Sequence, residues 1–209
     1  MSGRSSYDRW RVLSSPRDRV VAGAALAVFV AGARSARRGG VSPLELRCFQ
    51  AANALPHGAY APVWAFMQLG NLGGALGAGA VLRLTGRPEL GNRAAAVGTV
   101  AWVGAKAVKP FVRRGRPAYT VAAARVLGRE QAGLGYPSGH ATVAAAVASV
   151  VAPHLPRRWR APAWVVALAV GSTRSYVGAH LPLDIVGGAA LGIVIGAVGR
   201  GPAVVRGRA

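Results

Sequence analysis

The chain has 209 residues, with 26 Lys and Arg against 6 Asp and Glu, and therefore a formal net charge of +20. Hydrophobic residues make up 52% of the chain and charged residues only 15%. A soluble domain usually carries about 25% charged residues of both signs, and a disordered basic tail is poor in apolar residues. The composition therefore argues against both classes and favours an anionic partner such as a lipid headgroup, a nucleic acid or a phosphate.

The first predicted element covers residues 20–36 and follows a basic segment at residues 1–19, which we expect to be cytoplasmic. Arg17 and Arg19 precede an apolar run that ends in Ala31-Gly32-Ala33. This pattern fits a retained membrane span, and it also fits a signal peptide with a small-residue cleavage site. We favour retention because cleavage would leave an odd number of spans, but both interpretations of residues 20–33 stand on the sequence.

Five more apolar stretches follow in chain order, at residues 61–82, 94–111, 138–154, 161–177 and 183–200. A transmembrane helix needs about 20 apolar residues, which the second stretch has alone and the others reach if flanking Arg side chains extend to the interface. The sequence therefore predicts an all-α, polytopic membrane helix bundle of about six transmembrane helices. It forms one domain over residues 20–200, followed by a basic tail at 201–209. A soluble bundle is the alternative, which we disfavour because the stretches are apolar around the whole helix circumference.

Small residues recur every four positions within these stretches. Gly188, Gly192 and Gly196 would lie on one helix face. The same spacing occurs in Gly70 and Gly74, in Gly73 and Gly77, and in Ala141, Ala145 and Ser149. Such faces let helices pack closely in lipid, so we predict close helix contacts there.

The distribution of Arg predicts the orientation of the bundle. With a cytoplasmic N-terminus, 14 of the 26 bases fall inside and 12 outside. Six of the outside bases lie in or next to polar segments described below, and setting these aside leaves a clear cytoplasmic excess, as the positive-inside rule requires. We therefore expect these polar segments to lie at the outer face of the membrane.

Three polar segments would meet at that face, and their basic residues suit a phosphate. Lys109, Arg116 and Arg174 are cations whose only nearby acid in sequence is Asp184. Cations at a membrane interface are usually functional, and Arg binds phosphate through two parallel hydrogen bonds. Ser138 and Gly139 follow a proline and should begin a helix, whose free N–H groups would also attract an anion, although Ser-Gly at a helix start is ordinarily only a cap.

Two histidines supply the candidate chemistry. His180 and Asp184 are four residues apart at a predicted helix start, where the carboxylate can fix the imidazole tautomer and leave the other ring nitrogen free to attack. His140 would lie beside the bound phosphate and could protonate the leaving oxygen. The sequence thus predicts phosphoryl transfer through a phosphohistidine, with no metal ion and no cofactor, because Lys and Arg supply the positive charge.

Three motifs carry a resemblance to a known family. Lys-x6-Arg-Pro at 109–117, Pro-Ser-Gly-His at 137–140 and Arg-x5-His-x3-Asp at 174–184 together resemble the signature of the type 2 phosphatidic acid phosphatase family, in its six-helix membrane branch. The resemblance implies His180 as nucleophile, Asp184 as its partner and His140 as acid. It implies these phosphate ligands: Lys109, Arg116, Ser138, Gly139 and Arg174. One departure is Thr173, where the family usually has Ser.

We therefore expect an integral membrane phosphatase of the bacterial inner membrane that hydrolyses a lipid phosphate or diphosphate. An isoprenoid or polyprenyl carrier of cell-wall biogenesis and a phosphatidic-acid-like lipid both fit, and the sequence does not separate monophosphate from diphosphate. The alternatives are a non-catalytic membrane scaffold or transporter and, less favoured, a nucleic-acid-binding protein, whose bases would cluster on one face. Membrane lipids are the expected surroundings, and homo-oligomers are left open.

Overall fold

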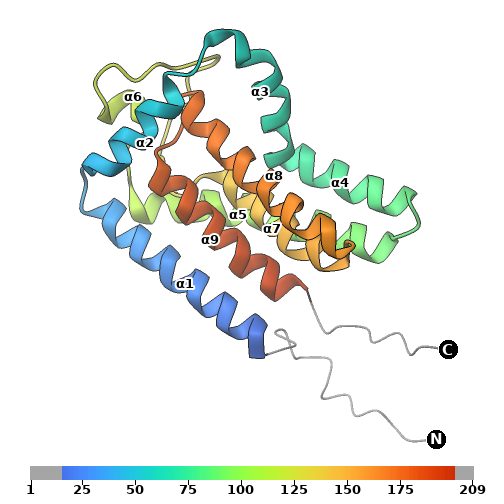
Figure 1. Ribbon diagram of the computed structural model, residues 1–209. Coiled ribbons are helices and arrows are strands. Elements are labelled where there is room, and N and C mark those ends of the chain that lie inside the picture. Colours follow the sequence, from blue (N-terminus) through green and yellow to red (C-terminus); the bar gives the residue numbers. More distant parts are fainter. Residues whose placement is uncertain (1–15, 201–209) are drawn as a thin grey trace, which may run out of the picture.

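The computed structural model describes residues 16–200, which are all-helical, without a β-strand. The predicted N-terminal segment up to residue 15 and the tail at 201–209 lie outside the described residues. The elements, shown in Figure 1, are α1 (Pro16–Arg37), α2 (Pro43–Asn53), η2 (His57–Ala59), α3 (Tyr60–Met67), η3 (Gln68–Gly70), α4 (Leu72–Leu84), α5 (Pro88–Val112), α6 (Pro117–Thr120), α7 (Gly139–Val151), η4 (Ala152–His154), α8 (Arg157–Tyr176) and α9 (Pro182–Gly199). The predicted all-α helix bundle is confirmed.

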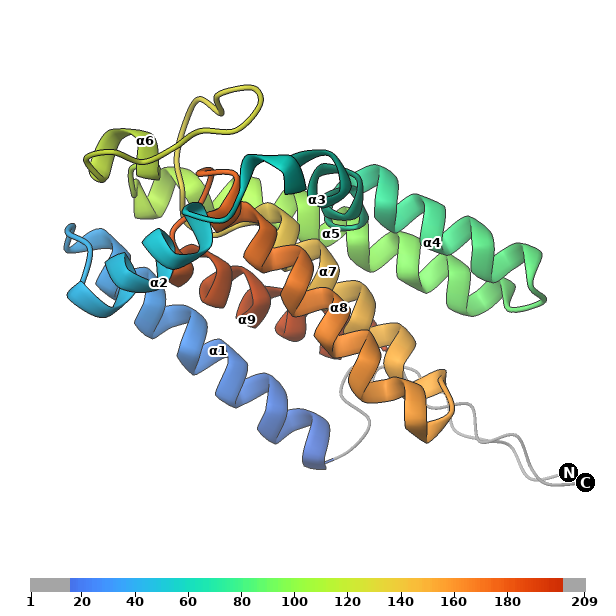
Figure 2. The same cartoon turned by 45° about the horizontal axis from the view of Figure 1, so that its top comes forward.

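Helix α7 forms the centre of the bundle. It packs against α5, α8 and α9, while α1 lies along α9 and α4 pairs with α5 (Figures 1 and 2). The largest core cluster joins α4, α5 and α7 through Ala75, Val97, Ala101, Val143 and Val150. Small side chains dominate this core, so the helices approach each other closely.

The predicted faces of small residues meet each other between α7 and α9. A Cβ atom added at Gly188 would contact Ser138 O and lie 3.1 Å from Ala141 Cβ. One added at Gly192 would contact Thr142 O and lie 2.9 Å from Ala145 Cβ, and one at Gly196 would contact Ser149 Cβ. We call this contact, Gly188/Gly192/Gly196 on Ala141/Ala145/Ser149, the α7–α9 seam. The Gly73 and Gly77 pair forms no such face, because a Cβ at Gly77 has no atom within 4 Å.

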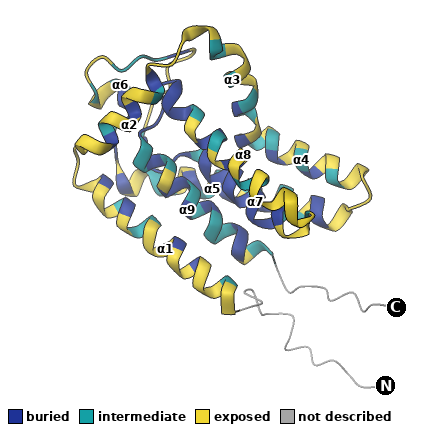
Figure 3. Cartoon of the chain, in the orientation of Figure 1, coloured by how far each residue is buried: buried dark blue, intermediate teal, exposed yellow. Residues whose placement is uncertain are grey.

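The apolar outer surface of the helices fits a membrane. Two helices, α1 and α9, are long and apolar enough to cross a bilayer on their own. The segments His57–Gly70 and Leu72–Leu84 pass the same test only as a pair bent by 69°. Much of α1 and the outer face of α8 is exposed (Figure 3), including Leu26 and Val165.

The bent pair corrects the continuous helix predicted over 61–82. Asn71 breaks it: its side chain accepts a hydrogen bond of 2.7 Å from Gly74 N and so caps a new helix, α4. The structure also adds α2, a helix of 11 residues that no predicted span includes. The total of six spans stays a prediction.

The ends of the helices gather the three motifs at one end of the bundle. The C-terminal ends of α1, α5 and α8 lie there with the N-terminal ends of α7 and α9, and α2 and α6 cover them (Figure 2). At the opposite end an ion pair of 3.0 Å joins Arg200 at the end of α9 to Asp18 in the first turn of α1. We call the motif-bearing end the site end.

Candidate active site

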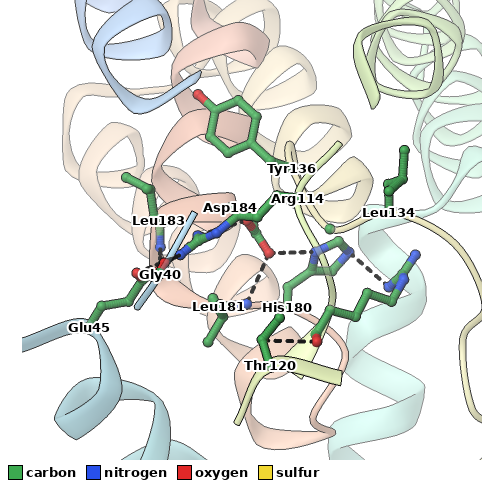
Figure 4. Close-up of polar contacts among 12 residues, drawn as sticks. Gly40, Glu45, Arg114, Thr120, Leu134, Tyr136, His180, Leu181, Leu183 and Asp184 are labelled. Carbon is green, nitrogen blue, oxygen red and sulfur yellow. Dashed lines mark hydrogen bonds and ion pairs between the residues drawn. The ribbon is translucent and has the colours of Figure 1, made fainter. Parts of the chain in front are cut away.

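His180 lies in the short loop between α8 and α9, and Asp184 in the first turn of α9. The His180 Nδ1 atom is 3.3 Å from Asp184 Oδ2, and the same oxygen accepts a hydrogen bond of 3.0 Å from Leu181 N. Both side chains are buried. The predicted pair is therefore assembled, and its geometry leaves His180 Nε2 as the ring nitrogen that does not face the carboxylate (Figure 4).

Backbone hydrogen bonds fix the loop that carries His180. Its N–H and that of Ala179 both donate to Arg174 O, at 3.1 and 2.9 Å. The Ser175 hydroxyl donates to His180 O at 3.0 Å. The end of α8 thus sets the position of the imidazole.

The free nitrogen of His180 points toward the predicted phosphate ligands. His180 Nε2 lies 3.5 Å from Arg116 Nη1, which also donates to Ala179 O at 2.9 Å. Arg116 follows α5 and is buried. Burial, and after it the nearby charges of Lys109, Arg174 and Arg116, hold the pKa of His180 well below its ordinary value of 6.5. The imidazole is accordingly neutral, as a nucleophile must be.

The other two predicted phosphate-binding cations, Lys109 and Arg174, also lie at the site end. Lys109 donates to Leu134 O at 2.7 Å and to Gly135 O at 3.0 Å, so the loop before α7 holds its ammonium group. Arg174 is 2% exposed and bonds to Met67 Sδ and, at 3.2 Å, to Gln131 Oε1. None of the three cations has an ion pair with a carboxylate within residues 16–200. Their charge remains available for an anion.

The start of α7 differs from an ordinary helix cap. Ser138 is its N-cap residue, but the Ser138 side chain makes no capping bond. The Ser138 Oγ atom is buried and, within the described part of the chain, has no hydrogen-bond partner. The Ser138 N–H donates to Asp184 O at 2.8 Å, so the backbone ties the start of α7 to α9 while the hydroxyl stays free.

Gly139 and His140 complete the first turn of α7. A Cβ atom added at Gly139 would have Ala105 Cβ, 4.0 Å away, as its nearest neighbour, so packing does not require glycine here. Space above the backbone suits a ligand that approaches it closely. His140 is partly buried, packs against η3 and lies near the positive charges of Arg174 and Arg116. All eight predicted site residues therefore lie at the site end.

A cavity of about 90 Å³ opens beside Arg116 and Arg174. Gln131 and Met67 line it, and Trp64 of α3 contributes an aromatic wall. Among residues 16–200, no three side chains of the His, Cys, Asp and Glu types are grouped to hold a metal ion. Of the predicted phosphate ligands, Arg116 and Arg174 line this cavity.

Two residues that the motifs do not predict are linked to Asp184: Arg114 contacts it directly, and Glu45 contacts Arg114. Arg114 Nη1 lies 3.1 Å from Asp184 Oδ1, and the Arg114 guanidinium also pairs with both oxygens of Glu45, at 2.9 and 2.7 Å. Arg114 and Glu45 are 5% and 9% exposed, so this is a buried network (Figure 4). The signal in the sequence is weak: Glu45, Phe49 and Asn53 recur every four residues and form the buried face of α2.

Thr173, His57 and His154 do not contribute side chains to this site. Thr173, the departure from the family pattern, donates its hydroxyl to Val170 O in its own helix at 2.6 Å. His57 is exposed and stacks on Tyr60, and His154 lies in η4, past the far end of α7.

Comparison with known proteins gives one family and two similar structures. Residues 91–200 match the family model described as the PAP2 superfamily. No curated protein matches the sequence. The chain is similar to LpxE of Aquifex aeolicus, with 24% identity and a TM-score of 0.67, over 76% of this chain and 95% of that one. It is also similar to the first transmembrane PAP2-type phosphatidylglycerolphosphate phosphatase from Bacillus subtilis, with 23% identity and a TM-score of 0.68, over 84% and 92% of the two chains.

Proposed function

Because the chain belongs to the PAP2 superfamily and is a membrane phosphatase, we propose that it hydrolyses a lipid phosphate or diphosphate through a phosphohistidine intermediate, without a metal ion. One observation carries the proposal: at the site end His180 Nε2 faces Arg116, and the unpartnered hydroxyl of Ser138 and cations that lack a carboxylate partner within residues 16–200 lie at the same end of the bundle. A nucleophile, a hydrogen-bond donor and positive charge are the parts that phosphoryl transfer requires.

In the first step His180 Nε2 attacks phosphorus with its lone pair while the bond from phosphorus to the lipid oxygen breaks. The electron pair of that bond stays on the lipid oxygen, which takes a proton from His140. The negative charge of the bound phosphate favours the protonated form of His140 in the substrate complex. Asp184 stabilises the positive charge that develops on the imidazole ring and keeps its tautomer fixed. The products are the phosphohistidine and the lipid alcohol, or the lipid monophosphate when the substrate is a diphosphate.

In the second step water attacks the phosphohistidine. His140, now neutral, takes a proton from the water as its oxygen bonds to phosphorus and the P–N bond breaks. Inorganic phosphate leaves, and both histidines return to their starting states. Lys109, Arg116 and Arg174 stabilise the negative charge on the equatorial oxygens in both steps.

The substrate class follows from the position of the pocket. The helices that carry the site expose apolar side chains, so a lipid can present its headgroup to the site end from the bilayer. A phosphatidylglycerolphosphate-like or phosphatidic-acid-like lipid and an isoprenoid or polyprenyl phosphate are the candidates. We place the site end at the outer face of the bacterial inner membrane, because the bases at the opposite end then satisfy the positive-inside rule.

Retention of residues 20–33 is part of this proposal. Phe29 O accepts a hydrogen bond of 2.7 Å from Tyr136 of the loop before α7, and the two rings stack at 5.9 Å. Helix α1 thereby contributes to the wall behind the site. This contact supports a retained span rather than a removed leader.

The test is phosphate release by the purified protein in detergent from a panel of phosphatidic acid, phosphatidylglycerolphosphate, undecaprenyl phosphate and undecaprenyl diphosphate. His180→Ala should lower the rate about a thousandfold or more, because it removes the nucleophile. His57→Ala, which removes an exposed histidine, is the matched control and should keep the wild-type rate. EDTA should leave the rate intact.

Equal rates for wild type and His180→Ala would refute the phosphohistidine route, and complete loss of activity on chelation would refute the metal-free chemistry. Failure of wild type on every lipid would instead favour a scaffold or transporter.

A further inference from the structure

We propose that Glu45 of α2 is a positioning residue of the active site, which acts through Arg114 to hold Asp184 behind His180. This inference rests on the proposed function. Glu45 lies outside residues 91–200, the part of the chain that matches the family model. It therefore assigns a role in catalysis to a helix that the motifs do not include.

The first support is that the Glu45 carboxylate does not cap its own helix. Ser42 and Glu45 have the spacing of a capping box, in which the Glu side chain would bond back to the N-cap backbone. Ser42 Oγ does accept from Glu45 N at 3.2 Å. The Glu45 carboxylate points inward instead, and its oxygens accept from Arg114 and, at 2.9 Å, from Leu183 N.

The second support is the alternation of charge along the network. Glu45 is negative, Arg114 positive and Asp184 negative, and Asp184 faces His180 Nδ1. Arg114 Nη1 is shared, 2.9 Å from Glu45 Oε1 and 3.1 Å from Asp184 Oδ1. A charge-assisted, two-point contact fixes the plane of a guanidinium, so Glu45 determines where Arg114 meets Asp184.

The third support is that the same carboxylate also holds the helix that carries Asp184. Leu183 N belongs to the first turn of α9, directly before Asp184. A negative charge at a helix N-terminus is favourable, and here it lies on a neighbouring helix. One side chain thus sets the position of Asp184 through both its side-chain partner and its backbone.

The second buried polar residue of α2 acts on the other end of the same loop. Asn53, two turns after Glu45, donates to Tyr176 O at 2.9 Å and to Arg125 O at 2.8 Å, and it accepts from Arg125 N at 2.8 Å. Helix α2 therefore contacts the 174–184 segment at both ends, which is the arrangement expected of an element that positions it.

The experiment compares Glu45→Gln with wild type and with Glu89→Gln, a matched change at an exposed acid in the first turn of α5. Glu45→Gln keeps the side-chain volume and one oxygen but loses the charge. The expected result is a fall in kcat of about 10- to 100-fold with little change in KM, since small displacements of catalytic groups cost rates of this order. Glu45→Asp should recover part of the loss.

A second readout does not depend on turnover. The chain has four histidines, so the ring nitrogens of ¹⁵N-histidine-labelled protein can be resolved by NMR and assigned to His180 with the His180→Ala variant. We expect Glu45→Gln to shift the His180 Nδ1 signal and Glu89→Gln to leave it unchanged. Thermal unfolding of both variants shows whether the bundle is intact.

A wild-type kcat and an unchanged His180 signal in Glu45→Gln would overturn the inference. So would a loss of kcat that merely follows loss of the folded bundle, with the His180 signal unchanged in the remaining folded protein. If instead the wild type hydrolyses no lipid of the panel, the proposed function fails, while the NMR comparison still decides whether Glu45 positions His180.

Discussion

Asp184 is fully buried, and its partner is Arg114 rather than one of the predicted phosphate ligands. This choice of partner separates two tasks. Arg114 balances the buried carboxylate, because an unpaired buried charge is costly. Lys109, Arg116 and Arg174 are then left for the phosphate that we propose they bind.

The lowered pKa of His180 predicts that its imidazole stays neutral in mildly acidic solution. Its pKa is lowered, so the ring stays neutral as the pH falls below 6.5 and becomes charged only as the pH passes through the lowered pKa. At about pH 5.5 an ordinary histidine is mostly protonated. We expect the ¹⁵N signals of His180 in the substrate-free protein to remain those of a neutral imidazole at that pH. A midpoint near 6.5 would show that burial and the three cations do not act on the ring as the structure implies.

At the scale of helices, the α7–α9 seam joins the two halves of the site. Helix α7 carries Ser138 and His140 at its start, and α9 carries Asp184. Their backbones approach closely because the seam has no side chain larger than Ser. Helix packing therefore sets the distance between His140, the proposed acid, and the loop of His180, the proposed nucleophile.

Gly192→Val should disturb this packing. A Cβ at this position would contact Thr142 O and lie 2.9 Å from both Ala145 Cβ and Ala146 N, and overpacking of this kind costs about 1–3 kcal/mol. We expect a lower thermal unfolding temperature by circular dichroism and a lower phosphatase rate. Gly77→Val is the matched control, because a Cβ there has no atom within 4 Å. Equal unfolding temperatures for Gly192→Val and Gly77→Val would show that close packing at the seam does not stabilise the bundle.

Sequence patterns identify the motif residues because their chemistry and spacing are local. His180 and Asp184 lie four residues apart, and the structure brings them within 3.3 Å. The Glu45–Arg114 network is not local: its members are 69 residues apart and meet only through the fold. In sequence Glu45 resembles an ordinary first-turn acid, so its inward direction could not be predicted.

The break in the predicted helix over 61–82 has a different cause. Apolar composition continues through the break, so hydropathy alone does not show it. Asn71 is the local signal, since Asn favours N-caps over helix interiors. The prediction rests on composition alone, and in the structure the capping residue divides the segment into two helices.

At the scale of the whole molecule, the two ends of the bundle differ in chemistry. The site end carries Lys109, Arg116 and Arg174, and the opposite end carries Arg158 at the start of α8 and the Arg200–Asp18 ion pair. The proposed orientation places the site end outside the cell. Cys48, the only cysteine of the chain, is exposed on α2 at that end and can report on it.

Membrane-impermeant thiol reagents should therefore label Cys48 in intact spheroplasts. In a Cys48→Ala background, Arg158→Cys places a thiol at an exposed position of the opposite end, and it should react only after permeabilisation. The comparison is between the wild type, labelled at Cys48, and the Cys48→Ala/Arg158→Cys double variant. Each is the full chain and carries a single thiol. The reverse pattern would place the site in the cytoplasm and invert the proposed topology.

The seam between α7 and α9 also has a thermodynamic consequence. Folding ordinarily restricts side-chain rotamers, but Gly and Ala have no rotamers to lose. The close approach of the two helices is thus achieved at little side-chain entropy cost, because Ser149 is the one residue of the seam with a rotamer to fix. The position of the two helices along each other's axes is therefore set by backbone shape. The spacing of the proposed catalytic groups should accordingly persist up to the temperature at which the helices separate.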